Sequence, residues 1–296
     1  MTGPVVVGLD GSPASLTAAW WAAREALKRN LSLLLLHSWT TQPLDVPIAQ
    51  AAPSKQQYGR EVLHRAEAEI LHRYGDLTLT TQLVSDPASR VLVERSRSAA
   101  MLVLGSRGHG TLTGFLLGST SLHVLGRTHC PAVAVRSEDP SVECGWGHPA
   151  AADRNEVVVG MGELGPAAGA LLEFAFADAE LNGSRIRAVR ACPLLGLVTD
   201  PHLMATEHPG DRYKAEEQTR LADALAPWRE KFPTVPVVEH IAVGPAAHVL
   251  LATAPHARLA VVGRRRRPSH HTWHLGPVAH GALHHLPCPV AVIPHD

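Results

Sequence analysis

Residues 105–121, GSRGHGTLTGFLLGSTS, combine the residue types that bind phosphate through the backbone. Glycine has no Cβ, so an anion can approach the main chain closely at these positions. Gly118 is followed by three hydroxyl residues at an expected helix start, where unpaired N–H groups and the helix dipole favour negative charge. Arg107 adds a positive charge to the same stretch. A glycine-rich loop that only caps a helix has the same appearance, so the stretch alone leaves phosphate binding and a structural loop both open.

The elements around this stretch alternate between apolar runs and helical segments, which predicts an α/β fold with a parallel sheet covered on both faces. Ser12 is expected to cap the first helix and Asp86 the third. Ligands in such sheets bind at the carboxyl ends of strands where the strand order reverses. In the first half of the chain the expected strands are 5–9, 31–37, 77–84, 101–104 and 131–136, and the expected helices are 13–30, 55–74, 87–98 and 119–127.

The chain repeats itself. The start VVVGLDGSP (5–13) matches VVVGMGELG (157–165) at an offset of 152 residues. The later segments match at an offset of 158 residues, as THCPAVAV (128–135) does with LPCPVAVI (286–293). We therefore expect a first domain at residues 1–136, a turn-rich linker at 137–154 and a second domain of the same fold at 155–296.

These motifs together resemble the universal stress protein family. Gly105, Gly108, Gly118 and Ser119 match the G-2x-G-9x-G-[ST] signature of its ATP-binding members, and VGLDGS, LLHSW and CPAVAVR are similar to other family segments. The resemblance implies two tandem doubly wound five-stranded sheets with strand order 3-2-1-4-5. It also implies an ATP site, with or without Mg²⁺, between the first and fourth strands of the first domain.

The resemblance carries the nucleotide contacts over to the three strand ends of the first domain. The nucleoside is expected at Asp10, the adenine at the backbone of His37 and Ser38, and the ribose and phosphates at the glycines and hydroxyls of the signature. For Asp10 an Asx-turn that only shapes the first loop is the alternative, and ligand contact is favoured. The full predicted site is Leu9, Asp10, Gly11, Ser12, His37, Ser38, Leu104, Gly105, Arg107, Gly108, Gly118, Ser119, Thr120 and Ser121.

The second copy departs from the signature. Gly162 stands where the first copy has Asp10, and Pro277 removes one N–H donor from the helix start. We expect this domain to keep the fold and to have lost the ATP mode. The replacements at the phosphate end are Arg266 for Gly108, Pro277 for Ser119, Val278 for Thr120 and Ala279 for Ser121.

Two further features of the second copy can each be interpreted as structural or as functional. Arg264–Arg267 is interpreted as a solvated loop, with charge-based capture of another anion as the alternative. His280 and His284 have i,i+4 spacing that can hold a metal, but no further ligand type completes a set, so no metal is expected.

The composition limits the classes of function that the chain can have. Acidic and basic residues balance at 27 each, which argues against a nucleic-acid surface. The longest apolar runs are shorter than a membrane span, and the first residues lack the pattern of a signal peptide, so a cytoplasmic protein is expected. The 4 cysteines form no C-x-x-C pair, and Cys130 and Cys288 are expected to be buried thiols.

The expected function is a nucleotide-dependent regulator in stress response, without a catalytic set and with at most slow ATP hydrolysis. The alternative is an interaction scaffold whose nucleotide is structural or absent. An adenylating enzyme is disfavoured because no S-G-G-x-D-S loop occurs. The last strands of the two domains are expected to pair into an internal pseudo-dimer, a homodimer is possible, and protein partners are unknown.

Overall fold

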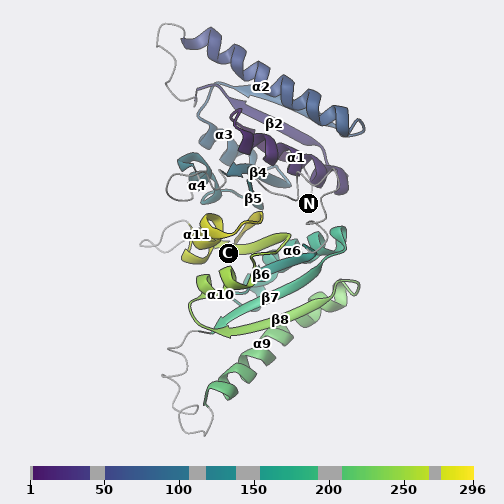
Figure 1. The fold of residues 1–296 in the computed structure, drawn as a ribbon, viewed down its shortest axis with the longest axis vertical. Helices are drawn as coiled ribbons and strands as arrows, with labels where there is room; N and C mark the ends of the chain where they lie inside the picture. Colours follow the sequence, from purple (N-terminus) through teal and green to yellow (C-terminus); the bar gives the residue numbers. More distant parts are fainter. Residues whose placement is uncertain (1–2, 41–50, 107–117, 138–153, 193–208, 267–274) are drawn as a thin grey trace. The chain divides into compact units, whose positions relative to one another are not determined.

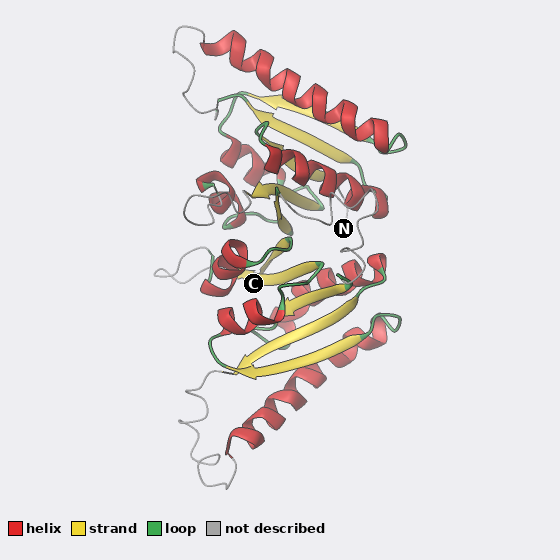
Figure 2. Cartoon of the chain, in the orientation of Figure 1, coloured by secondary structure: helices red, strands yellow, loops and turns green. Residues whose placement is uncertain are grey.

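A computed structural model describes residues 3–40, 51–106, 118–137, 154–192, 209–266 and 275–296. In the helix at 51–73 the side chains are described from residue 55 onward, and in the helix at 209–231 from residue 213 onward. The chain divides into two compact units, Met1–His148 and Pro149–Asp296 (Figure 1). Each unit is a parallel sheet with helices against it, as the colouring by secondary structure makes clear (Figure 2). The pairing of the two last strands stays a prediction.

The first unit contains one parallel sheet in the order β3-β2-β1-β4-β5. The order runs one way from β1 to β3 and the other way from β1 to β5, so right-handed crossovers place helices on both faces. The predicted order 3-2-1-4-5 is confirmed here. The strands are β1 (Val5–Leu9), β2 (Leu33–Ser38), β3 (Leu79–Val84), β4 (Met101–Ser106) and β5 (Ala132–Arg136), and the helices are α1 (Pro13–Lys28), α2 (Ala51–Arg73), α3 (Ala88–Arg95) and α4 (Ser119–Leu125).

The second unit repeats this order as β8-β7-β6-β9-β10. Its first helix differs from α1 because a 3₁₀ turn, η4 (Pro166–Ala168), precedes it. The strands are β6 (Glu156–Gly160), β7 (Arg185–Cys192), β8 (Val237–Val243), β9 (Leu259–Arg265) and β10 (Val290–His295), and the helices are α6 (Gly169–Asn182), α9 (Pro209–Lys231), α10 (Ala246–Thr253) and α11 (Pro277–His285).

The central strands are buried because both faces are covered, which explains their continuous apolar runs. Val5–Val7 and Met101–Leu104 are buried, whereas β3 has no buried residue. The predicted half-buried edge strand is confirmed, but its exposure does not alternate along the strand. Cys130 and Cys288 are buried free thiols, and burial raises the pKa of the Cys130 thiol to about 11. No helix among the described residues combines the length and apolarity needed to cross a bilayer.

Two local predictions are wrong. Asp86 does not cap α3: Pro87 occupies the N-cap position without a side-chain bond. The Asp86 carboxylate instead lies 3.7 Å from Arg90, and its carbonyl accepts a hydrogen bond from Ser38. Arg264 and Arg265 lie at the end of β9 rather than in a loop, since β9 continues to pair with β10 at these positions.

Gly105 allows the first turn of α1 to pack directly against the end of β4. A Cβ at this position would lie 2.5 Å from the carbonyl atoms of Ala14 and 2.7 Å from the nitrogen of Ser15. The obstacle is backbone, so it cannot move without shifting the helix. At the equivalent position in the second unit, a Cβ on Gly263 would meet only the ring of His295, at 2.8 Å.

We predict that Gly105→Ala lowers the free energy of unfolding by about 1–3 kcal/mol, because the added methyl forces α1 away from the sheet. Gly263→Ala is the matched control and should cost less, because the partly exposed His295 ring can rotate aside. Urea denaturation of the full chain measures both. Equal losses in the two variants would show that the helix start in the first unit is free to adjust.

Candidate functional site

The carboxyl ends of β1, β2 and β4 bring most of the predicted site residues to one edge of the first sheet. Leu9 and Leu104 are buried core residues, each 4% exposed, so they shape the floor of the site. Arg107 and Gly108 fall outside the described residues.

Asp10 forms the Asx-turn that is the alternative interpretation of its role. Its Oδ1 accepts the Ser12 N–H at 2.9 Å, and its own N–H donates to Ser15 Oγ at 3.3 Å. Partial desolvation raises the pKa of the Asp10 carboxyl, but hydrogen bonding by Ser12 and Ser15 outweighs it and leaves the pKa below its ordinary value. The group is therefore a carboxylate at neutral pH, with Oδ2 making no hydrogen bond among the described residues.

The turn at Gly11 and Ser12 connects Asp10 to α1. Ser12 caps the helix, as predicted, by accepting the Ser15 N–H at 3.2 Å. Gly11 has a φ of 84°, and a Cβ there would lie 2.4 Å from the hydroxyl oxygen of Tyr58. Tyr58, on α2, thus covers this turn, and its 43% exposure leaves part of the ring to solvent. The sequence pattern gave no signal for Tyr58, because its helix is joined to the sheet by a long connection.

The end of β2 contributes two side chains that are already engaged. The His37 ring is buried, and its Nδ1 lies 2.9 Å from the Leu9 carbonyl, so Nδ1 carries the proton and donates. Burial lowers the pKa of His37, although the Leu9 hydrogen bond and the charge of Asp10 oppose it. Ser38 Oγ donates to the Asp86 carbonyl at 2.6 Å. These side chains fix the strand end, which leaves its backbone edge as the feature available to a ligand.

The start of α4 is open. Gly118 is the N-cap with φ −57°, and a Cβ there would meet no atom of the described residues within 4 Å. Ser119 and Thr120 are exposed and Ser121 is partly buried, and their hydroxyls make no hydrogen bond among the described residues. Among the described residues, the site therefore presents a glycine that neither the backbone conformation nor the packing explains, followed by three available hydroxyls.

The second unit has different chemistry at the matching strand end. Arg190 follows Val189 on β7 and takes the place of His37, since its Nη1 donates to the Met161 carbonyl at 3.1 Å as His37 donates to Leu9. Its Nε donates to the buried Glu217 at 2.8 Å. Glu217 is the ninth residue of α9, as Gly59 is of α2. The first unit therefore has His37 and Gly59 at the two positions where the second unit has the ion pair of Arg190 with Glu217.

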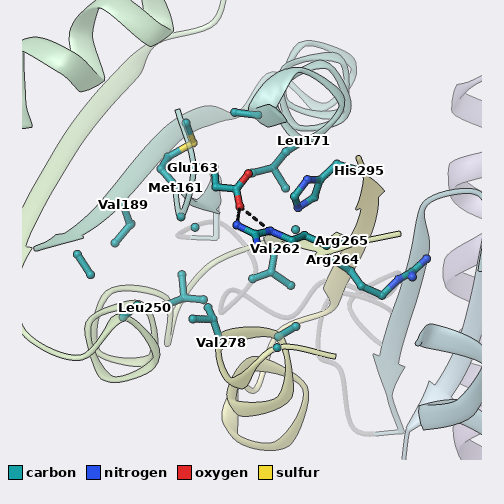
Figure 3. A pocket seen from close by; sticks show the side chains of 18 of the residues that line it. Met161, Glu163, Leu171, Val189, Leu250, Val262, Arg264, Arg265, Val278 and His295 are labelled. Atoms are coloured by element: carbon teal, nitrogen blue, oxygen red, sulfur yellow. Dashed lines mark hydrogen bonds and ion pairs between the residues drawn. The ribbon is translucent and has the colours of Figure 1, made fainter. Parts of the chain in front are cut away.

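A cavity of about 630 Å³ lies at this edge of the second sheet (Figure 3). It is bounded by the ends of β6, β7 and β9, by η4 and the start of α6, and by α10 and the start of α11. Glu163 and Arg265 point toward one another across it and form an ion pair, while the Arg264 side chain points away (Figure 3).

The arginine run does not act as one cluster. Arg264 is buried, and burial lowers the pKa of its guanidinium to about 10, with the charge of Arg266 contributing. Arg265 pairs with Glu163, and Arg266 lies 3.6 Å from the carboxylate of Asp296. The rings of His280 and His284 are in contact, with centroids 4.3 Å apart and planes tilted by 31°. Within the described ranges, no group of three or more histidine, cysteine or acidic side chains is placed to hold a metal.

The fold and the strand-end site define a tandem α/β protein of the doubly wound class. The sequence model of the universal stress protein family matches residues 1–136 and 154–294, so the chain belongs to the universal stress protein family.

Known relatives agree over almost the whole chain. A universal stress protein of Mycobacterium tuberculosis is 30% identical over 319 residues, covering 99% of this chain and 96% of the relative. A universal stress protein of Mycolicibacterium smegmatis is 29% identical over 299 residues, covering 98% of this chain and 96% of the relative. The crystal structure of a universal stress protein from Archaeoglobus fulgidus superposes with a TM-score of 0.74 at 17% identity, covering 99% of this chain and 98% of that one. The last likeness shows the fold.

The buried His37 predicts a pH dependence of stability. Its pKa in the folded protein lies below the ordinary value of 6.5, so the unfolded chain binds the proton more readily. The stabilisation by neutral His37 is present above about pH 6.5 and is lost as the pH falls toward the folded pKa. The advantage of wild type over His37→Gln in free energy of unfolding should therefore shrink between pH 7.5 and 5.5.

Urea titrations of both proteins at the two pH values make the measurement, and the difference between them cancels the other histidines. An advantage that stays constant or grows on acidification would mean that His37 is protonated in the folded protein.

Proposed function

We propose that the first unit binds an adenine nucleotide, with ATP as the expected ligand, and that the protein is a nucleotide-dependent regulator in stress response. The observation that carries the proposal is Gly118. Its φ is one that any residue adopts, and a Cβ there would meet no atom of the described residues within 4 Å, so the described structure gives no packing reason for glycine. A group from outside that approaches the backbone closely does call for it.

The phosphate end has suitable donors. The available hydroxyls of Ser119, Thr120 and Ser121 follow Gly118 directly, and Leu122 is the first residue of α4 whose N–H bonds back to Gly118. The N–H groups before it are the ones that a helix leaves unpaired. This set of neutral donors suits phosphate oxygens, and an ATP bound here would retain a Mg²⁺ that its own phosphates coordinate.

The nucleoside end is supported by Asp10. The Asx-turn holds Oδ1 and leaves Oδ2 able to accept a hydrogen bond from a ribose hydroxyl. The lowered pKa keeps the group ionised, and ionised acceptors make the stronger hydrogen bonds. The turn and the ligand contact are therefore compatible, since each uses a different oxygen.

We propose binding rather than catalysis. Hydrolysis needs a base or a metal-bound water directed at the γ-phosphate. His37 is buried with its N–H committed to Leu9, and Asp10 is held at the nucleoside end by its turn. Nucleotide then acts by stabilising one arrangement of the strand-end loops, which a partner protein can detect.

The test is ATP binding to the full chain with and without Mg²⁺, measured by isothermal titration calorimetry on wild type and Gly118→Phe. No atom of the described residues lies within 4 Å of a Cβ at this position, and the aromatic side chain would occupy the space of the phosphates, so affinity should fall by about tenfold or more. Excess ATP should raise the melting temperature of wild type and leave that of the variant nearly unchanged.

The matched control is Gly276→Phe, which changes the equivalent N-cap glycine of the second unit and has the same open surroundings. It should bind ATP as wild type does. If denatured wild type releases no nucleotide and ATP leaves its melting temperature unmoved, the protein is an interaction scaffold instead.

A further inference from the structure

The cavity of the second unit arises from a shortened first helix. In the first unit α1 starts at Pro13, immediately after the Ser12 cap, and packs against Gly105. In the second unit Gly165 stands at the position of Pro13 with φ 82°, the chain makes the turn η4, and α6 starts only at Gly169. The missing α-helical turn no longer covers the ends of β6 and β9, and Ala167 and Ala168 line the space that results.

The wall of the cavity is mostly apolar. Val189, Leu250, Val262 and Val278 gather at one end of it, from two strands and two helices (Figure 3). Met161, Leu171 and several alanines and glycines complete this surface. A volume of about 630 Å³ lies within the range of small-molecule sites, and such walls gain free energy by removing an apolar ligand from water.

The charges around the cavity favour an anion. Among the described lining residues Glu163 is the one acid, against the guanidinium groups of Arg190 and Arg265. The Arg190 charge is balanced behind the wall by Glu217, which Arg220 also contacts at 2.8 Å, so this group of three carries a net positive charge.

Arg265 is the cation that a ligand can reach. Its side chain is 69% exposed, and its guanidinium pairs with Glu163, whose side chain is 34% exposed. Exposed pairs of this kind contribute little to stability, so a carboxylate on a ligand can take the place of Glu163. Both bonds that Arg265 makes to described residues go to one oxygen of Glu163, and neither uses the guanidinium nitrogen Nη1, which can therefore bind an incoming group.

Nucleotide phosphates fit this wall poorly. Pro277 removes an N–H at the start of α11, and Val278 and Ala279 replace the hydroxyls that the first unit offers. A triphosphate would have to leave water for a surface of alanine, valine and leucine with one exposed guanidinium, and unpaired buried charge is costly.

We propose that the cavity of the second unit binds a small organic carboxylate with an apolar body, whose carboxylate pairs with Arg265 and whose body lies against Val189, Leu250 and Val262. Glu163 competes for Arg265 in the empty site and swings out when the ligand enters. The site is separate from the nucleotide site of the first unit.

The experiment uses octanoate and the neutral isostere octanamide as probes, titrated into the full-length protein by calorimetry. Octanoate should bind saturably with one site per chain and about fivefold more tightly than octanamide, which corresponds to one exposed ion pair. Glu163→Gln should strengthen octanoate binding several-fold and leave octanamide unchanged, because Arg265 is then unpaired. Arg265→Gln should remove the preference for the charged probe.

Gly276→Phe adds a ring to a residue that lines the cavity and has no described atom within 4 Å of a Cβ, so it should abolish binding of both probes. Gly162→Leu is a second filling variant at another lining position for which the same holds. Gly118→Phe is the matched control that should leave octanoate binding intact. ATP titrated into the same samples reports the first unit independently. Absence of saturable octanoate binding to wild type, octanoate binding that survives in Gly276→Phe, or ATP binding that Gly276→Phe abolishes would overturn the proposal.

Discussion

The contact between the first turn of α1 and Gly105 determines how the strand ends of the first unit are arranged. The helix backbone approaches the end of β4 so closely that a single methyl group would not fit. The contact fixes the position of Ser12 as cap, and the cap fixes the tight turn in which Asp10 bonds the Ser12 N–H. The position of the Asp10 carboxylate therefore depends on a packing contact between main chains, as much as on its own residue type.

The second unit shows what the same scaffold becomes when that contact is absent. The second unit has no counterpart of the Ser12 cap, and its chain enters the first helix through η4. The ring of His295 occupies the space against Gly263. The strand end then needs another stabilising interaction, and the pair of Arg190 with the buried Glu217 provides it. Ion pairs of this kind hold a geometry more than they add stability, since desolvation offsets much of their attraction.

Most strands and helices could be predicted from the sequence, because apolar runs mark them locally. The repeat then predicted a second domain of the same fold. The strand ends at Leu9 and Leu104 were predictable for the same reason, and so was the Ser12 cap. The packing role of Gly105 was not predicted: its lack of a Cβ makes room for α1, a contact that no local pattern shows. Tyr58 was missed because a helix face approaches the site only in the folded unit.

The second unit was harder to interpret from sequence for a physical reason. Substitutions at single positions suggested loss of a phosphate site, but the arginine run looked like one cluster until strand alternation separated its side chains. Arg264 is buried, and Arg265 points to the cavity and to Glu163 (Figure 3). Neighbours in a strand face opposite ways, so a run of like charges in a sequence is not a patch on a surface.

The two N-cap glycines, Gly118 and Gly276, have similarly open surroundings, but they are followed by residues of different chemistry. Gly118 and Gly276 have ordinary φ values, and no atom of the described residues lies within 4 Å of a Cβ built at either position, so the described packing explains neither glycine. The hydroxyls that follow Gly118 are replaced after Gly276 by proline, valine and alanine. If the second unit had merely lost a ligand, the apolar wall beside Gly276 would be expected to close, because empty apolar space forfeits dispersion contacts. The open glycine beside an apolar wall and an exposed guanidinium is better explained by a change in the ligand than by its loss.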